Sequence, residues 1–114
     1  MCLRQAKAVS IEGHPKPSYN GLYTHDSTHE GWPVWKNADG SYCYRCKVGD
    51  EWRLDDRFEL DEDICTASIV AKEGPLPVGV HTWQVYDGGK WGGRTLTVGL
   101  LVRPPLPSLP LALP

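Results

Sequence analysis

Short runs of alternating apolar and polar residues make up most of the chain, and glycine, proline or Asp/Asn-Gly pairs separate them. Alternation with a period of two is typical of a β-strand with one buried face. It is clearest over 65–72, where Cys65, Ala67, Ile69 and Ala71 share a face. No run has a convincing helical period, so the sequence predicts an all-β fold: a small antiparallel β-meander, sandwich or barrel. Further strands are expected at 7–12, 22–24, 32–36, 41–46, 51–54, 81–85 and 94–100.

The same alternation predicts which large side chains face the core. His81, Trp83 and Val85 share one face, so Tyr86 is expected on the opposite one. Trp35 is likewise expected on the face opposite Trp32 and Val34. Inward positions are expected for Trp52, Trp83, Tyr42, Tyr44, Leu96, Val98 and Leu100.

Turns are expected where glycine follows a polar residue. Asn37-Ala38-Asp39-Gly40 is the clearest hairpin connection, because Asp-Gly readily takes the positive φ angles of tight hairpin turns. Val48-Gly49-Asp50 and Asp87-Gly88-Gly89 are predicted to be two more. Pro33 has no N–H to donate to a ladder, so its run is predicted to be an edge strand or the start of a strand.

The chain divides into a patterned body and a proline-rich tail. Residues 7–102 carry the strand patterns and are predicted to form one aromatic-rich all-β module. Residues 103–114 have proline at nearly every second or third position, which favours an extended polyproline II or disordered segment. Aromatic-lined grooves recognise the Pro-x-x-Pro spacing of Pro104 to Pro107 and of Pro107 to Pro110, although Arg103 lies one position out of the usual register.

Composition and charge exclude several classes of protein. With 40% hydrophobic and 23% charged residues, the chain has the composition of a soluble globular domain. Its formal net charge is −2, and no basic stripe with interleaved aromatic residues occurs, so nucleic acid is not an expected partner. Apolar stretches are only a few residues long, so no transmembrane segment is expected. The compartment stays open.

Several aromatic motifs, taken in chain order, resemble a recurring module. It is similar to the Trp/Tyr-rich β-repeats of large multidomain proteins of algae and other unicellular eukaryotes, patterned N-G-x-Y, N-G-x-P-x-Y/W-x-N and W-x-L. The resemblance implies a β-fold and a non-enzymatic interaction role, without naming a ligand. This chain departs from the pattern by Glu30-Gly31 in place of Asn-Gly, by Cys43 and Cys46, and by its tail. The matching motifs are 20–23, 32–37, Gly40 with Tyr42 and Tyr44, 52–54, 75–79, Trp83 and 91–98.

The cysteines allow two kinds of site. Cys43, Cys46 and Cys65 are candidates for a disulfide that joins Cys65 to one of the other two, because Cys2 lies outside the patterned body. With His81 the same three residues offer four zinc ligands. However, residues three apart in a strand point to opposite faces, and no turn separates Cys43 from Cys46. Free or structural cysteines are therefore favoured, and no metal is expected.

No catalytic constellation is found. The acidic run 50–63 lacks the spacing of a calcium loop, and Arg53 and Arg57 interrupt it, so it is expected to be a solvated loop. Its carboxylates could also form a glycosidase pair, but so small a domain seldom forms the necessary cleft. The glycine-rich stretch 88–94 matches no phosphate-binding motif. We therefore expect no enzyme and no cofactor.

The remaining aromatic residues indicate a binding surface. Exposed indoles and phenols on a β-surface serve as protein-interface hot spots and as sugar-stacking platforms. We expect a non-enzymatic interaction or assembly module, an accessory subunit or one unit of a larger complex, that binds a protein partner. The alternative is a carbohydrate-binding domain that uses the same surface. The expected binding residues are Trp35, Tyr86, Trp91 and Arg94.

Overall fold

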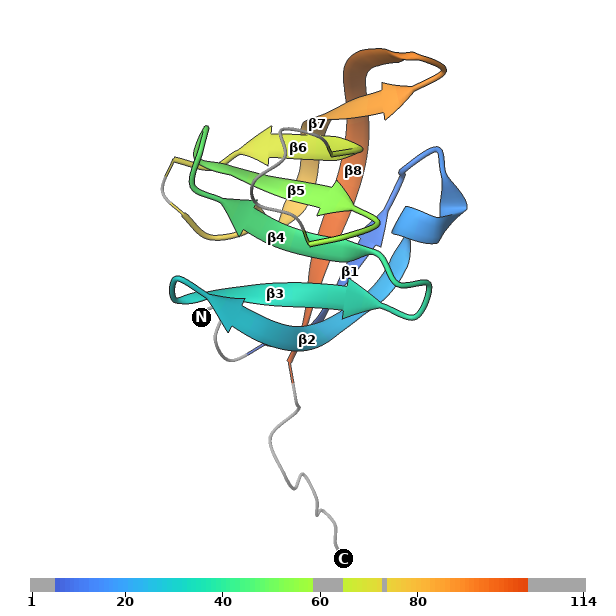
Figure 1. Ribbon diagram of the computed structural model, residues 1–114. Coiled ribbons are helices and arrows are strands. Elements are labelled where there is room, and N and C mark those ends of the chain that lie inside the picture. The colour runs from blue at the N-terminus through green and yellow to red at the C-terminus, as the bar shows by residue number, and fades with distance from the viewer. Residues whose placement is uncertain (1–5, 59–64, 73, 103–114) are drawn as a thin grey trace, which may run out of the picture.

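A computed structural model describes residues 6–58, 65–72 and 74–102, whose strands form one closed antiparallel barrel (Figure 1). The strands follow one another around the barrel in chain order, and the last pairs with the first. The all-β prediction is thus confirmed, with the barrel as its form. The strands are β1 (Ala6–Glu12), β2 (Gly21–His29), β3 (Trp32–Asn37), β4 (Tyr42–Cys46), β5 (Glu51–Asp55), β6 (Ala67–Val70), β7 (Gly79–Asp87) and β8 (Lys90–Val102).

Every strand contributes to a core inside the barrel. Trp52 and Trp83 are fully buried there, as their alternation predicted, and Tyr19 and Leu76 enter from the connections. Three large indoles fill the interior of so small a barrel, which gives it the apolar area that a short chain otherwise lacks. The core residues are Val9, Ile11, Tyr19, Tyr23, Trp35, Cys43, Trp52, Leu54, Ala67, Leu76, Trp83, Val85, Leu96 and Val98.

Tyr42 and Tyr44 do not face this core, contrary to expectation. The β3–β4 hairpin places Cys43 opposite Trp35, and the β4–β5 pairing places Cys43 opposite Leu54. Directly paired residues share a face of the sheet, so Cys43 enters the barrel and its two tyrosine neighbours turn outward. Tyr44 is nevertheless buried, because it belongs to a second cluster on the outer face with Val34, Cys46, Tyr42 and Phe58.

The turns lie where the sequence predicted them. Asn37 organises the β3–β4 hairpin: its Oδ1 accepts the N–H groups of Asp39 and Ser41 at 3.1 and 2.8 Å. Its Nδ2 donates to the Ser18 carbonyl at 2.8 Å, which ties the hairpin to the 3-10 turn η2 (Pro17–Tyr19). Pro33 is the second residue of β3 and precedes the part that pairs with β4, so it marks a strand start.

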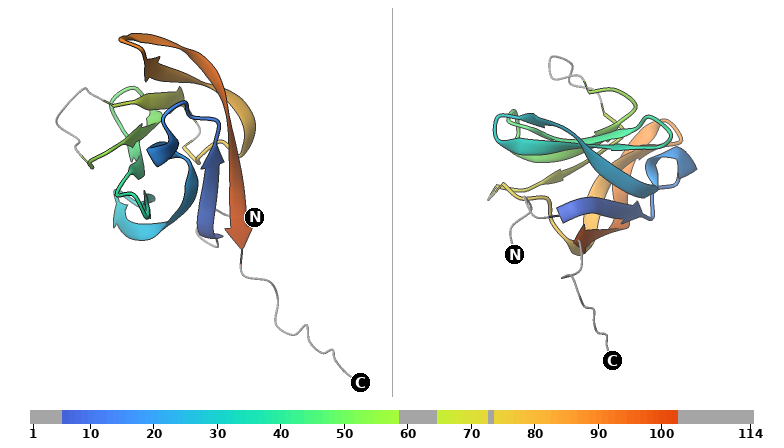
Figure 2. Two further views of the ribbon diagram at one scale, coloured as in Figure 1. Left: turned by 90° about the vertical axis from the view of Figure 1, so that its right-hand side faces the viewer. Right: turned by 90° about the horizontal axis from the view of Figure 1, so that it is seen from below.

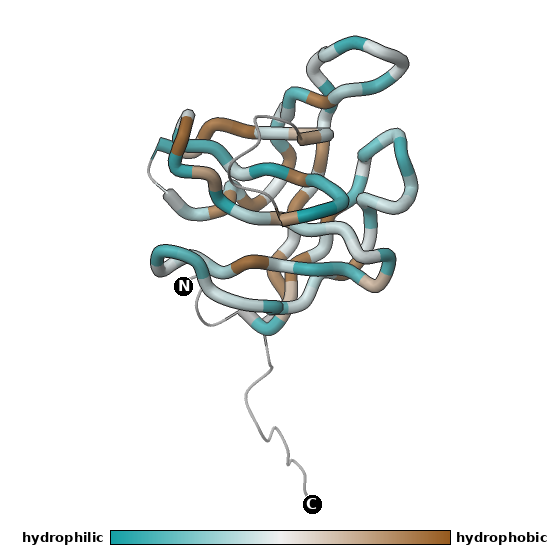
Figure 3. Tube along the Cα trace, in the orientation of Figure 1, coloured by the Kyte–Doolittle hydropathy of each residue, from teal (hydrophilic) through white to brown (hydrophobic). Residues whose placement is uncertain are grey.

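Two connections rise at one end of the barrel, the β1–β2 connection with η2 and the tip of the β7–β8 hairpin (Figures 1 and 2). Hydrophobic residues occur as short stretches within the strands, whereas both rising connections are mainly hydrophilic or neutral along the trace (Figure 3). Among the described residues no helix has the length and apolarity to cross a membrane. The tail 103–114, Cys2 and the acidic residues 59–63 lie outside the described residues.

Candidate functional site

The β7–β8 hairpin extends beyond the strands beside it. Its ladder runs from the pair Gly79–Val98 to the pair Asp87–Lys90. By contrast, β6 pairs with β7 only at Ala67–Val85 and Ser68–Gln84, and β1 pairs with β8 no further than Glu12–Thr97. Gly88 and Gly89 close the hairpin with φ angles of 64° and 86°, as a tight turn of this kind requires. Tyr86 still donates its N–H to the Thr66 carbonyl at 2.9 Å, so the hairpin is two-stranded only beyond this residue. We call its end, residues 86–91, the arm.

Tyr86 and Trp91 face each other across this arm. They are direct cross-strand partners, with ring centroids 5.5 Å apart and planes at 59°. Their strand neighbours Trp83 and Val85 point into the barrel, so alternation turns the pair outward. Tyr86 is 47% exposed and Trp91 is 48% exposed. The last strand was expected to begin only at residue 94, after the glycine-rich stretch, but β8 begins at Lys90 and includes Trp91.

The other two expected binding residues lie elsewhere. Trp35 is 1% exposed and belongs to the core, so the expectation that it faces solvent is wrong. Arg94 has the opposite strand parity to Trp91 and therefore lies on the other face of the hairpin. There its Nη2 binds Asp87 Oδ2 at 2.7 Å, with both side chains about half exposed.

A cleft of about 430 Å³ separates the arm from the β1–β2 connection. Tyr86, Asp87 and Gly88 line one side of it, and the segment from His14 to Pro17 lines the other, with Tyr19 and Thr66. Gly13 directs the chain into this segment at a φ of 106°, and a Cβ there would lie 2.6 Å from the Thr95 carbonyl oxygen of β8. Only glycine therefore permits this close crossing of β8.

His14 is the most constrained polar residue of the cleft. It is 5% exposed, and its backbone N–H and C=O are both bound by the Asn20 amide at 2.9 Å. Its Nδ1 accepts the Lys16 N–H at 2.9 Å, so the ring proton is on Nε2. This nitrogen is fully buried and is directed at the backbone of Thr66, but it makes no hydrogen bond of good geometry among the described residues. Burial lowers the pKa of His14, so the ring is neutral at physiological pH.

A second, shallower hollow of about 330 Å³ lies on the Trp91 side of the pair. Its floor is polar, because Arg53 is 3% exposed and its Nε binds Glu51 Oε2 at 2.7 Å. Gln84 and Ser68 complete the polar lining. The aromatic pair thus stands between two depressions: Tyr86 borders the cleft and Trp91 borders the polar hollow.

The cysteines form neither of the sites considered from the sequence. Cys43, Cys46 and Cys65 are free thiols. Cys43 lies inside the barrel and Cys46 in the outer cluster, on opposite sides of β4. Cys65 lines the polar hollow beside Arg53, not the core face predicted for it. Within the described ranges, no three His, Cys, Asp or Glu side chains gather as metal ligands.

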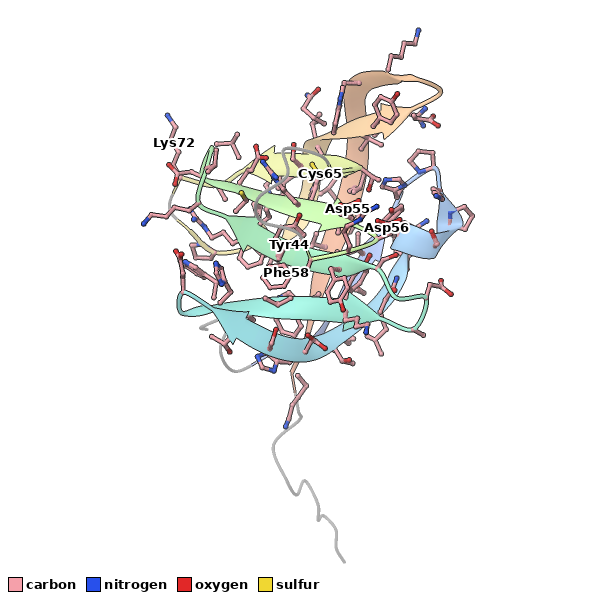
Figure 4. All side chains as sticks on the ribbon, viewed as in Figure 1. Tyr44, Asp55, Asp56, Phe58, Cys65 and Lys72 are labelled. Carbon is pink, nitrogen blue, oxygen red and sulfur yellow. The ribbon has the colours of Figure 1, made fainter. Side chains whose placement is uncertain are left out.

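Of the acidic run 50–63, Glu51 lines the polar hollow, whereas Asp55 and Asp56 line neither depression. Asp55 and Asp56 are at the end of β5, while Tyr44 and Phe58 pack together over the outer side of β4 (Figure 4). Burial raises the pKa of Asp55. His81, the fourth zinc ligand considered, is exposed and hydrogen-bonds the Val78 carbonyl at 3.0 Å.

Comparison with known proteins adds no relative: no protein-family model, curated protein or solved structure matches this chain significantly. The candidate site therefore depends on its own geometry. Sequence reasoning identified Tyr86 and Trp91 and missed His14. The signal available for His14 was the Gly-His-Pro-x-Pro stretch, where glycine and prolines fix the backbone around one polar ring.

Proposed function

We propose that this chain is a non-enzymatic interaction module that binds a protein partner through the β7–β8 arm. The exposed Tyr86–Trp91 pair is the observation that supports it. Tyrosine and tryptophan offer a large contact area with few rotamers to order, and they are enriched among the residues that dominate binding energies. A pair of them at the end of a projecting hairpin is open to a partner of any size.

The arm is also suited to docking because little of it must become ordered on binding. Its residues are paired in a continuous ladder, and the Asp87–Arg94 ion pair crosses the other face of the hairpin. A preorganised surface binds more tightly than a flexible loop with the same contacts, because less conformational entropy is lost. The depressions on either side can accept side chains of the partner.

Site-specific photocrosslinking tests this function. A photoreactive phenylalanine at position 91 should give discrete protein adducts in an extract of the source cells. The same group at Val48, which is 71% exposed in the β4–β5 turn, should not give them. Adducts that are the same from both positions, or absent from position 91, would contradict the proposal.

Carbohydrate binding is the second candidate, and the polar hollow beside Trp91 favours it. Sugar sites combine one aromatic face with planar polar side chains, and here Gln84 and the Glu51–Arg53 ion pair adjoin the indole. A glycan array separates the two functions. Sugar binding that both Trp91→Ala and Gln84→Ala abolish would establish the second candidate and displace the first.

A further inference from the structure

We propose that the Tyr86–Trp91 pair and the adjoining His14 cleft form a receptor for a proline-rich segment, and that this segment is 104–110 of a second copy of the chain. The inference rests on the proposed function, because it names the partner for the same surface. Three observations carry it: the geometry of the aromatic pair, the cleft that adjoins it, and the length of β8 between the arm and Val102, beyond which the prolines follow in the sequence.

The aromatic pair has the form of a proline-binding wedge. With centroids 5.5 Å apart and planes tilted by 59°, the rings leave no space for a third ring between them, but about half of each side chain is open to solvent. A pyrrolidine ring can lie across the exposed parts of both rings, as in other aromatic-lined grooves for polyproline II ligands. No residue in the described part of the chain accepts a hydrogen bond from the Trp91 indole, so it is free to donate to a peptide carbonyl.

The cleft supplies a second position at a suitable spacing. A polyproline II helix has three residues per turn and a rise of about 3.1 Å per residue, so prolines three apart lie on one side at about 9 Å. When one proline occupies the wedge, the next can reach the cleft beyond Tyr86.

The sequence contains a ligand with this spacing. Pro104, Pro107 and Pro110 are each three residues apart. Polyproline II recognition suits such a segment, because a proline-rich chain loses little conformational entropy when it binds.

The segment cannot reach the arm of its own molecule. Trp91 lies eleven residues before Val102, where β8 ends, which at about 3.3 Å per strand residue is roughly 36 Å. Pro110 lies eight residues beyond Val102, and eight residues would span only about 25 Å even in an extended polyproline II helix. The prolines therefore have to bind the arm of another copy.

Contacts of this kind are heterologous, because the proline-rich segment of one copy binds the arm of the next. Heterologous contacts form rings when the rotation closes and open chains when it does not. Self-association should consequently depend on concentration and require both the arm and the prolines.

Sedimentation velocity on the full chain, at up to about 1 mM, tests this inference. Two variants should each remain monomeric: Trp91→Ala, and a proline variant with Pro104→Ser, Pro107→Ser and Pro110→Ser. Mixing them should restore dimers and nothing larger, because the mixture has one intact arm and one intact segment. Val80→Ala, on the outer face of β7 at 67% exposure, is the matched control and should associate like the unmodified chain.

Titration of a synthetic 103–114 peptide into the proline variant, followed by tryptophan fluorescence, gives an independent measurement. Trp91→Ala should weaken this binding at least about tenfold. Circular dichroism and thermal unfolding check that each variant is folded.

A monomeric unmodified chain, or association that the proline variant leaves unchanged, would overturn the inference. Binding of a proline decamer without binding of the 103–114 peptide would assign the surface to another proline-rich protein and would equally overturn self-recognition. Failure in these assays together with specific crosslinks from position 91 would leave the proposed function standing and remove only this partner.

Discussion

Trp32 packs against Gly74 so closely that a Cβ on this glycine would lie 2.5 Å from two atoms of the indole ring. The carbonyl oxygen of Gly74 accepts the Trp52 indole N–H at 2.6 Å and the Arg45 Nε–H at 3.1 Å. Arg45 in turn lies over the Trp32 ring at 5.4 Å. Gly74 thus helps to fix the connection between β6 and β7 to the barrel, together with Leu76, whose side chain enters the core.

Replacement of Gly74 by alanine should strongly destabilise the fold. Its φ of 103° is one that side chains rarely adopt, and the added methyl group would displace the Trp32 ring. Strain and overpacking together should lower the free energy of unfolding by about 3 kcal/mol. Urea unfolding followed by tryptophan fluorescence measures the change. Gly92→Ala is the control, because nothing lies within 4 Å of its Cβ position, and it should change stability by less than about 0.5 kcal/mol.

Replacement of Glu30 by asparagine should stabilise the chain. Glu30 and Gly31 connect β2 to β3 with φ angles of 52° and 85°, a turn in which Asn-Gly is preferred. Asparagine tolerates positive φ better than glutamate, and the 3.5 Å contact of Glu30 with His29 is exposed and weak. We expect a gain of about 0.5 to 1 kcal/mol in the same urea experiment. A loss of stability would show that the Glu30 side chain stabilises the fold by more than the strain that its positive φ angle costs.

The predictable part of this fold is the part that local sequence determines. Strand positions and glycine turns follow from alternation and from the conformations open to Asp39-Gly40 and Gly88-Gly89, and the structure agrees. Closure of the barrel depends on β1 meeting β8, a pairing between opposite ends of the patterned region that no local signal contains.

The errors concern which face of a strand is buried. A hairpin register that pairs Trp35 with Cys43 puts both in the core, and a shift by one residue reverses every assignment. Sequence alternation could not show which face of these strands enters the barrel, because Tyr44 and Val34 on the other face are apolar enough to form their own outer cluster. His14 was missed because its burial depends on tertiary packing of the β1–β2 connection, in which the ring lies against Tyr19 and lines a cleft with Thr66 and Tyr86.

The stability of the fold should decrease below neutral pH partly because of His14. Burial lowers its pKa from the ordinary 6.5, and the Lys16 N–H donating to Nδ1 requires the neutral ring. The unfolded chain therefore takes up the proton first, so the stabilisation is present above pH 6.5 and is lost as the pH falls toward the folded-state pKa. Neighbouring charges on Asp87 and Lys16 act in opposite directions.

His14→Asn isolates this contribution, because an asparagine oxygen can accept the same N–H two residues on. Urea unfolding between pH 7 and pH 5 should show a shallower fall in stability for the variant than for the unmodified chain. The other histidines and Asp55 are present in both proteins, so their contributions to the pH dependence of stability cancel in the comparison. Equal slopes would mean that the pKa of His14 is the same in the folded and unfolded states, which would contradict the lowering by burial.

The thiols of Cys43 and Cys65 should resist alkylation while the protein is folded. Burial raises the pKa of Cys65 to about 11, and burial raises that of Cys43 further. At pH 8 few Cys65 thiols are ionised, and the reactive species is the thiolate. Iodoacetamide labelling with peptide mass spectrometry should show both sites unmodified in buffer and modified in urea. Rapid labelling of Cys43 in buffer would indicate that the barrel opens.

The pairing of Ala6 with Val102 brings the entry and exit of the barrel to one place. A domain whose ends lie close together can be inserted into a surface loop of a host protein without distorting the domain or the host. It can also be circularly permuted, when its ends are joined and a turn is opened. The exit from the barrel lies at the end away from the arm, so a neighbouring domain attached there would leave Tyr86 and Trp91 uncovered.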